Sequence, residues 1–292
     1  MTEPSVLLVD ASPYIFRAHF ALPSSIVDVE GRPSNAVYGF GSFLLKLIGE
    51  EGPTHLGVAF DRSLSTSFRN ELYPEYKQHR DAPPADLEAQ LEDCETLARS
   101  IGAAAFSDAR FEADDLLAAL CDLTAPHRAT VVTSDKDLSQ LVDSRVEWLD
   151  YGKGLRYGPV EVEERFGVGP ARIPDLLGLA GDPVDNIPGV EGIGPKTALS
   201  LLERFESVEA LCQDPGSIAD LGLRGGARIQ RLIEEQGDRA ILSKELATVV
   251  RSVALPTTLD DLVLAPPRRP ELDRLFERLG FESLLQRILE RA

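Results

Sequence analysis

The feature that most constrains the fold is a set of short apolar runs that each end at an aspartate. These runs are residues 6–10 (VLLVD), 56–61 (LGVAFD) and 129–135 (ATVVTSD). Longer segments with helical spacing of apolar residues lie between them, such as 36–49 and 112–123. Strands that alternate with helices are typical of a mostly parallel sheet covered on both faces. The sequence therefore predicts an α/β fold with a mostly parallel central sheet flanked by helices.

The aspartates that end these runs would lie together at one edge of the sheet. In α/β sheets, groups used for chemistry gather beyond the carboxyl ends of the strands. A single aspartate there is more often a loop or cap residue, but three converging strands favour a shared function. For acidic residues at a helix start, capping of the helix dipole remains an alternative. The candidate cluster contains Asp10, Asp61, Glu112, Asp114, Asp115, Asp135, Asp137, Asp182 and Asp185.

Nine carboxylates that share a cleft would repel one another unless cations compensated their charge. Oxygen ligands without His or Cys select Mg²⁺ or Mn²⁺. In phosphodiester hydrolysis, two such ions about 3.5–4 Å apart can activate water, clamp the phosphate and stabilise the leaving oxygen. The cluster therefore indicates a hydrolytic chemistry that needs no protein nucleophile.

The charge balance of the whole chain argues against a nucleic-acid partner. The formal net charge is -18, with 48 acidic and 30 basic side chains, and affinity for nucleic acid comes largely from Lys and Arg. A local basic face can nevertheless coexist with an acidic average. Residues 62–80 are net positive, with Arg62, Arg69, Lys77 and Arg80 against Glu71 and Glu75. In isolation this segment could also be a solvated helix of mixed charge.

Cysteine usage and hydropathy bear on the cellular location. Cys94, Cys121 and Cys212 are far apart and odd in number, so we expect buried free thiols rather than a disulfide framework or a zinc ribbon. There is no apolar run of 18 residues and no signal-peptide pattern at the start. We therefore expect a cytoplasmic protein that does not associate with membranes.

After residue 152 the pattern changes to helices with Gly- and Pro-rich joints. Residues 180–198 (AGDPVDNIPGVEGIGPKTA) place two carboxylates before a glycine-rich turn. Gly192 and Gly194 permit close approach of a backbone, and the helix from Pro195 presents its positive end, to which Lys196 adds charge. The turn is suited to a phosphate, although a plain helix–helix turn is the alternative.

Five separated segments, in this order and spacing, resemble the bacterial 5′-nuclease family. They are VLLVD with YIFRAHFAL, AFDRSLSTSFRNELYPEYKQHR, FEADD, TSDKDLSQL and GDPVDNIPGVEGIGPKTA. The family includes the 5′–3′ exonuclease domain of DNA polymerase I and stand-alone relatives similar to flap endonucleases. The resemblance covers essentially the whole chain, and because no polymerase follows, it implies a stand-alone nuclease.

The resemblance also implies an organisation. Residues 1–157 would form a catalytic core of the PIN/flap-endonuclease type, with a helical arch at about 62–95. Residues 158–292 would form a helical DNA-binding region with a helix-hairpin-helix at about 186–206 and a C-terminal segment that wraps around.

By the same resemblance, the nine carboxylates bind metal. Asp10, Asp61, Glu112 and Asp114 would hold the ion nearer the catalytic water, and Asp135, Asp137, Asp182 and Asp185 the other, with Asp115 in support. Lys77 and Arg80 would be catalytic contacts to the phosphate, and Tyr76 would stack on a base. The residues expected to bind DNA are Arg69, Tyr76, Lys77, Arg80, Gly192, Gly194 and Lys196. A K⁺ ion at the hairpin is expected beside Mg²⁺.

The sequence thus predicts a monomeric, structure-specific 5′-nuclease with a two-metal-ion mechanism, in Okazaki-fragment processing or repair. Its substrate would be DNA with a 5′ flap or a single-strand/duplex junction, and RNA–DNA hybrid 5′ ends are a further expectation. Two alternatives stay open: a DNA-junction binding protein with little hydrolysis, and an RNase of the related α/β class. Substitution of Asp135 by Asn would separate the first alternative from a nuclease.

Overall fold

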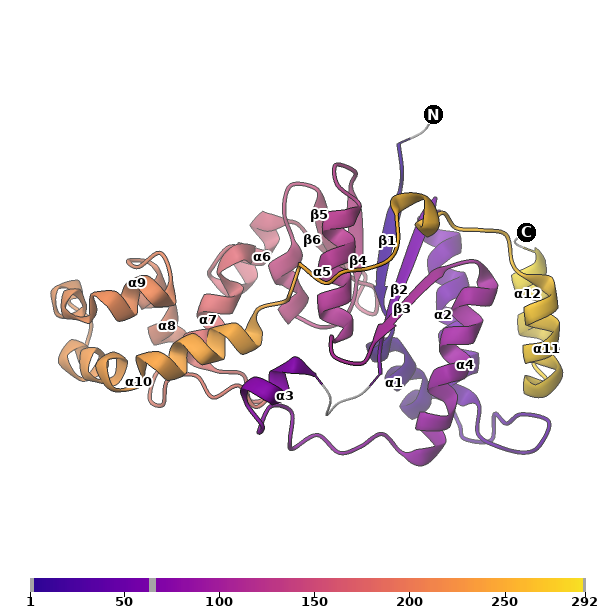
Figure 1. The fold of residues 1–292 in the computed structure, drawn as a ribbon, viewed down its shortest axis with the longest axis horizontal. Coiled ribbons are helices and arrows are strands. Elements are labelled where there is room, and N and C mark those ends of the chain that lie inside the picture. The colour runs from indigo at the N-terminus through magenta and orange to yellow at the C-terminus, as the bar shows by residue number, and fades with distance from the viewer. Residues whose placement is uncertain (1–2, 63–66, 291–292) are drawn as a thin grey trace.

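The computed structural model describes residues 3–62 and 67–290, and its centre is the predicted sheet (Figure 1). The described strands are ordered β3-β2-β1-β4-β5-β6, and all neighbours are parallel except β5 and β6. Every residue of β1 is buried, as expected for a parallel strand covered on both faces. The strands are β1 Val6–Asp10, β2 His55–Asp61, β3 Ala104–Asp108, β4 Ala129–Val132, β5 Val146–Asp150 and β6 Leu155–Tyr157.

Alternate side chains of β1 enter two different cores, because successive residues of a strand point to opposite faces. Leu7 and Val9 pack with α1, α2 and α4 on one face. Val6 and Leu8 pack with α5 and the short 3-10 helices η1 and η4 on the other. The helices of this core are α1 Ser12–Ala21, α2 Asn35–Glu51, α3 Phe68–Leu72, α4 Ala85–Ile101, α5 Ala113–Leu123, η1 Asp137–Leu141 and η4 Leu259–Leu262.

The strand order reverses between β1 and β4. The chain adds β2 and β3 on one side of β1, then passes through α5 and returns as β4 on the other side. A crevice forms at the carboxyl ends of the strands at such a switch point. This is the edge at which the sequence places its aspartates.

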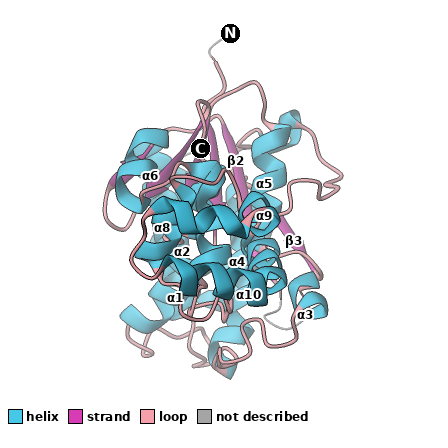
Figure 2. Cartoon of the chain, turned by 90° about the vertical axis from the view of Figure 1, so that its left-hand side faces the viewer, coloured by secondary structure: helices cyan, strands magenta, loops and turns pink. Residues whose placement is uncertain are grey.

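A second group of helices has its own core beyond β6. Trp148 and Tyr157 stack with ring centroids 4.3 Å apart and join this core to the sheet. Seen end-on, α8, α9 and α10 form the part nearest the viewer (Figure 2). These elements are α6 Pro159–Phe166, η2 Pro170–Arg172, α7 Ile173–Ala180, α8 Pro195–Leu202, α9 Val208–Gln213, η3 Pro215–Leu221 and α10 Gly226–Ala247.

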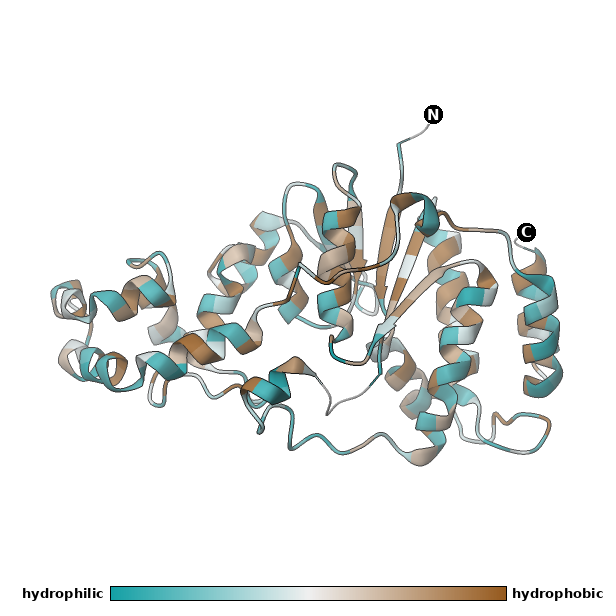
Figure 3. Cartoon of the chain, viewed as in Figure 1, coloured by the Kyte–Doolittle hydropathy of each residue, from teal (hydrophilic) through white to brown (hydrophobic). Residues whose placement is uncertain are grey.

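The C-terminal segment crosses back to the α/β core and ends in α11 Arg269–Leu279 and α12 Glu282–Glu290 (Figure 1). Leu272, Leu284 and Ile288 are fully buried in the core that contains α2 and α4. The outer surface of α11 is largely polar, whereas the central strands are apolar (Figure 3). The C-terminal helices thus pack on the α/β core, because each has an apolar stripe that α2 and α4 cover.

The predicted arch is less helical than expected. Residues 63–66 lie outside the described residues, α3 has a single short turn, and residues 73–84 follow without a helix before α4 begins. Pro74, Pro83 and Pro84 explain the break, since proline removes a helix hydrogen bond and restricts its predecessor. Lys77 lies within this segment with a φ of 53°, which a helix does not tolerate.

Within residues 3–62 and 67–290, no helix is long and apolar enough to cross a membrane. Cys94 and Cys121 are buried free thiols, as predicted, and Cys212 is a partly buried one.

Candidate active site

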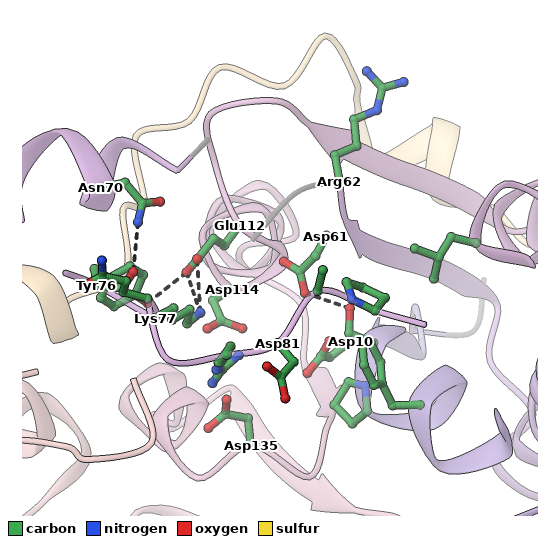
Figure 4. A pocket seen from close by; sticks show the side chains of 18 of the residues that line it. Asp10, Asp61, Arg62, Asn70, Tyr76, Lys77, Asp81, Glu112, Asp114 and Asp135 are labelled. Atoms are coloured by element: carbon green, nitrogen blue, oxygen red, sulfur yellow. Dashed lines mark hydrogen bonds and ion pairs between the residues drawn. The ribbon is translucent and has the colours of Figure 1, made fainter. Parts of the chain in front are cut away.

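A cavity of about 980 Å³ opens between the carboxyl edge of the sheet and residues 74–83 (Figure 4). We call it the acidic pocket. Figure 4 shows carboxylates from three different elements that point into the same space. Five of the nine predicted ligands line it: Asp10, Asp61, Glu112, Asp114 and Asp135.

Hydroxyl and amide donors hold two of these carboxylates in place. The Thr133 hydroxyl donates to Asp10 Oδ2 at 2.7 Å, and the Ser12 hydroxyl donates to Asp61 Oδ2 at 2.7 Å. The backbone N–H of Ala113, in the first turn of α5, donates to Asp61 Oδ1 at 2.8 Å. Ser12 and Thr133 were not predicted as site residues. The available signal was their position: Ser12 lies two residues after Asp10, and Thr133 lies two residues before Asp135.

The carboxylates in the pocket carry more negative charge than the protein neutralises. Burial, followed by the charge of Asp61, raises the pKa of Asp10 well above its ordinary value. Burial, followed by the charge of Asp135, does the same to the pKa of Asp114. Burial also raises the pKa of Asp135. These groups would bind protons or cations more readily than isolated carboxylates.

Asp114 is the carboxylate best placed to receive a cation. It points into the acidic pocket, and no residue in the described ranges donates a hydrogen bond to it (Figure 4). Asp81 also lines the pocket and points toward the same space, from the opposite wall. Asp81 was not predicted as a site residue, because a carboxylate beside Arg80, at the end of a net basic segment, is typical of a mixed-charge surface.

Lys77 and Arg80 face the carboxylates from the opposite wall. Lys77 Nζ lies 3.0 Å from Glu112 Oε1 and 3.5 Å from Asp185 Oδ2. Arg80 pairs with the same Asp185. Burial alone would lower the pKa of Lys77, but Glu112 holds it well above its ordinary value, so the ammonium is charged. The structure therefore places both predicted catalytic cations at the pocket wall.

A second carboxylate pair lies beside the pocket rather than on its lining. Lys136 Nζ donates to Asp137 Oδ1 at 2.9 Å and to Asp182 Oδ2 at 2.6 Å. Burial, followed by repulsion from Asp135, raises the pKa of Asp137 to about 7. Lys136 was also missed, although its place between two aspartates in SDKD was the available signal.

The donor set of the acidic pocket fits hard divalent cations. Its lining offers carboxylate oxygens and no His or Cys, which is the chemistry that Mg²⁺ prefers. In the part of the chain that the structure describes, no three His, Cys, Asp or Glu side chains stand close enough to hold one metal ion together. Lys77 and Lys136 instead each form ion pairs with two carboxylates.

Asp115 and Arg69 form a buried ion pair away from the pocket. Asp115 is fully buried and does not line the pocket, because both of its oxygens accept from Arg69 at 2.8 Å. Arg69 is 2% exposed, so its guanidinium cannot contact DNA in this arrangement. A metal-supporting carboxylate and a DNA-binding arginine were expected, and the structure joins the two into one buried ion pair.

Tyr76 corrects a second expectation. Its side chain is 3% exposed, which leaves no ring face for a base to stack on. Its hydroxyl instead donates toward Glu112 Oε2 at 3.1 Å and Asp185 Oδ2 at 3.2 Å. Lys77 Nζ lies 4.9 Å from the centre of the ring. Tyr76 thus supports the carboxylates and the lysine from behind.

The predicted glycine-rich hairpin joins α7 to α8. Gly192 has a φ of 90°, and a Cβ built there would lie 2.8 Å from Arg228 Nη2 of α10. Gly194 is the N-cap of α8, has a negative φ, and has open space on its Cβ side. Lys196 follows in the first turn of α8. Asp182 and Asp185 precede the hairpin on the side of the acidic pocket, so one segment borders both regions.

Comparison with protein families finds two matching models. Residues 5–167 match the 5′–3′ exonuclease, N-terminal resolvase-like domain, and residues 168–270 match the 5′–3′ exonuclease, C-terminal SAM fold. DNA polymerase I of Mycobacterium leprae is 38% identical over 296 residues, which cover 99% of this chain and 32% of that protein. The chain thus spans about a third of the length of the curated relatives it matches.

Solved structures share the fold. The flap endonuclease of bacteriophage T5, in a complex with DNA and metal ions, matches with a TM-score of 0.66 and 19% identity over 98% of this chain and 97% of that one. The catalytic core of Rad2 with a DNA substrate matches with a TM-score of 0.64 and 14% identity, over 99% and 92% of the two chains. Both likenesses extend over the sheet and the helical region together.

Proposed function

The chain belongs to the 5′–3′ exonuclease family, and from this premise we propose that it hydrolyses DNA phosphodiesters at a 5′ flap or a single-strand/duplex junction. Family membership makes the chain a nuclease. The choice of substrate, the metal and the roles of the residues are our proposal, as is action in the cytoplasm during replication or repair.

One observation carries the proposal: acidic and basic groups face each other across a single pocket at the switch point of the sheet. Asp10, Asp61 and Asp114 approach from the strand ends and the start of α5. Lys77 and Arg80 approach from the segment that crosses the opening. A phosphate in this pocket would meet cationic donors on one side and carboxylates suited to metal on the other.

Mg²⁺ is the cofactor that we propose, with Mn²⁺ as a substitute. Asp10, Asp61, Glu112, Asp114 and Asp135 would hold it in the acidic pocket, and Asp137, Asp182 and Asp185 would extend the site on its far side. A bound divalent cation supplies Lewis acidity toward a phosphate and its attacking water. The raised pKa values of Asp10 and Asp114 support this, because the cations at the pocket wall do not offset the repulsion between the buried carboxylates.

Lys77 and Arg80 would bind the phosphate that is cleaved. Both already point toward the pocket, and their present partners are carboxylates rather than solvent. A phosphate that enters would compete with Glu112 and Asp185 for these cations. Donors fixed where charge develops on the phosphoryl oxygens stabilise the transition state of transfer.

The hairpin before α8 would bind the duplex part of the substrate. The open space at Gly194 and the N-terminus of α8 suit a backbone phosphate, and Lys196 adds charge there. Outward-facing carbonyls of the hairpin would hold K⁺. The T5 and Rad2 structures contain DNA, which supports DNA as the partner of this chain, while RNA–DNA hybrid ends are a further proposed substrate.

The proposal is tested with a duplex that carries a 5′ flap labelled at its 5′ end, next to a blunt duplex and a free single strand. With Mg²⁺ we expect cleavage near the flap junction, slower cleavage of the other two substrates, and no cleavage in EDTA. Binding of the flap without cleavage in either Mg²⁺ or Mn²⁺ would favour a junction-binding protein. Preferred cleavage of an RNA duplex would favour the RNase alternative.

A further inference from the structure

Arg69 uses every nitrogen of its guanidinium in the interior of the protein. Its Nη1 and Nη2 donate to the two oxygens of Asp115 at 2.8 Å each. Nη1 also lies 3.3 Å from Glu112 Oε2. Nε donates to the carbonyl of Leu246 at 2.8 Å, and Nη2 donates to the carbonyl of Thr248 at 3.0 Å. A bidentate pair with two added carbonyls is specific in geometry as well as strong.

These contacts join three parts of the fold that are distant in sequence. Arg69 belongs to α3, next to the segment that carries Lys77 and Arg80. Asp115 belongs to the first turn of α5. Leu246 and Thr248 lie at the C-terminal end of α10, the long helix that also contacts the hairpin through Arg228. The guanidinium therefore joins α3, the first turn of α5 and the C-terminal end of α10.

The ion pair also fixes the direction of the first turn of α5. Asp115 Oδ2 accepts from the backbone N–H of Glu112 at 3.2 Å, and Asp115 Oδ1 accepts from that of Val250 at 2.8 Å. Since Asp115 is held on the far side of the turn, Asp114 is turned toward the pocket, and Glu112 lies between Arg69 and Lys77. Rotation of this turn would displace both pocket carboxylates together.

We propose that Arg69 is a positioning residue that sets Glu112 and Asp114 in the acidic pocket and ties them to the end of α10. The inference rests on the proposed function, because it assigns Arg69 a role in the same site. Arg69 acts through Asp115 and the start of α5 and touches neither DNA nor metal.

The buried position of Arg69 makes the role separable from DNA contact. A residue that binds DNA through its charge changes the affinity and its salt dependence when it is removed. A residue that aligns the reacting groups changes the rate at saturating substrate and leaves substrate affinity unchanged. Arg69 is 2% exposed, so we expect only the second kind of change.

The test compares Arg69→Met, Arg69→Lys and Asp115→Asn with a matched control. Arg69→Lys keeps the charge but loses the planar fork that meets both Asp115 oxygens. The control is Arg110→Met, because Arg110 Nη2 pairs with Glu71 at 3.0 Å and so also links α3 to the segment before α5, but at the exposed surface. All variants are assayed at a temperature at which thermal unfolding shows each to be folded.

Two readouts are measured. The first is single-turnover cleavage of the flap duplex over a range of enzyme concentrations, which separates the maximal rate from the affinity for DNA. The second is binding of Mn²⁺ without DNA, followed by electron paramagnetic resonance. We expect about a 10- to 100-fold loss in maximal rate and in Mn²⁺ affinity for all three variants. Losses of this size are typical when a residue that hydrogen-bonds to metal ligands is replaced. Affinity for DNA and all values for Arg110→Met should stay within about threefold of the wild type.

A double variant with Glu112→Gln adds a further requirement. If Arg69 acts through Glu112 and its turn, Arg69→Met should slow the Glu112→Gln enzyme much less than it slows the wild type. Fully additive losses would overturn the inference, as would Arg69→Lys at the wild-type rate and Mn²⁺ affinity. If Arg69→Met fails to fold, Arg69→Lys and Asp115→Asn decide the question. A wild type that binds Mn²⁺ but cleaves no 5′ end would refute the proposed function, while the Mn²⁺ comparison would still decide the role of Arg69.

Discussion

At the scale of single residues, the site is built from cations shared between carboxylates. Lys77 lies between Glu112 and Asp185, and Lys136 lies between Asp137 and Asp182. Each lysine offsets only part of the charge around it, so the remaining carboxylates keep raised pKa values. The site is therefore prepared for further cations, and its stability without metal should depend on pH.

Asp137 gives the pH prediction. Its pKa is about 7 in the folded protein against an ordinary value of 3.8, so the folded state holds this proton more tightly than the unfolded chain does. Without metal, loss of the proton therefore lowers the free energy of unfolding as pH rises from about 4 to about 7, and the penalty stays constant above that. Asn does not titrate. In EDTA, Asp137→Asn should gain stability relative to the wild type across this window, measured by urea unfolding. A difference that does not change with pH would contradict the assignment.

Tyr76→Phe tests the corrected role of that tyrosine. The change removes a buried hydroxyl that lies within hydrogen-bond distance of Glu112 and Asp185, so the free energy of unfolding should fall by about 1–3 kcal/mol. Affinity for DNA should stay unchanged, because the ring is buried. Tyr73→Phe is the control, since Tyr73 donates to Glu75 at the exposed surface. A loss of DNA affinity in Tyr76→Phe alone, without loss of stability, would mean that the hydroxyl contacts DNA instead of supporting the carboxylates.

Sequence spacing predicted the residues whose positions follow from the sheet. Asp10 and Asp61 end neighbouring parallel strands, so they had to meet. The orientation of Asp115 away from the pocket could not be predicted, because spacing at the start of a helix does not say which carboxylate of EADD turns toward it. That direction is set by Arg69 and Val250, and Val250 is 135 residues away from Asp115. The burial of Tyr76 could not be predicted either, since it depends on contacts with distant segments.

At the scale of elements, proline and glycine decide the shape of the two segments that border the pocket. Pro74, Pro83 and Pro84 keep residues 73–84 from forming the helix that the family resemblance implied. Asn186 has a φ of 58°, and its side chain donates to the carbonyl of Glu75, which docks the turn before the hairpin against that segment. The hairpin was predicted from its glycines, whereas this docking could not be, since it depends on long-range contacts.

The two hairpin glycines should differ in what their substitution affects. Gly192→Ala places a side chain at a φ of 90° and against Arg228, so we expect a loss of about 1–3 kcal/mol in stability together with weaker duplex binding. Gly194→Ala should change stability by less than about 0.5 kcal/mol, because its Cβ meets open space at a negative φ. It should still weaken duplex binding if a phosphate occupies that space. The measurements are urea unfolding and duplex titration of both variants. Equal duplex affinity of Gly194→Ala and the wild type would exclude a phosphate at Gly194.

At the scale of the whole molecule, the chain closes on itself. The helical region begins beyond β6, its longest helix returns to Arg69 and Asp115, and the last two helices cover α2 and α4. The division at residue 157 therefore describes the order of the elements along the chain better than it describes their packing. The pattern after residue 152 predicted helices in this part of the chain, but it could not identify the surface that the last two cover.

Leu284→Ala tests this packing. Leu284 is fully buried, and its side chain contacts α2 close to Gly41. Loss of a buried leucine leaves a cavity, so the free energy of unfolding should fall by about 2–5 kcal/mol. Gln286→Ala on the same helix is the exposed control. The α/β core and α12 should unfold together in one transition. An unchanged unfolding free energy in Leu284→Ala would mean that α12 contributes nothing to the core.

The central claim is that the carboxylates in the acidic pocket serve catalysis rather than folding or DNA binding. Asp114→Asn tests it most directly, because Asp114 points into the pocket with no donor among the described residues. Single-turnover cleavage of a 5′-labelled flap duplex should fall by at least about a hundredfold, since the proposed metal site would lose one ligand. Affinity for the same duplex in EDTA should be equal to or tighter than that of the wild type, because a negative charge is removed. Cleavage by Asp114→Asn at the wild-type rate would contradict the account.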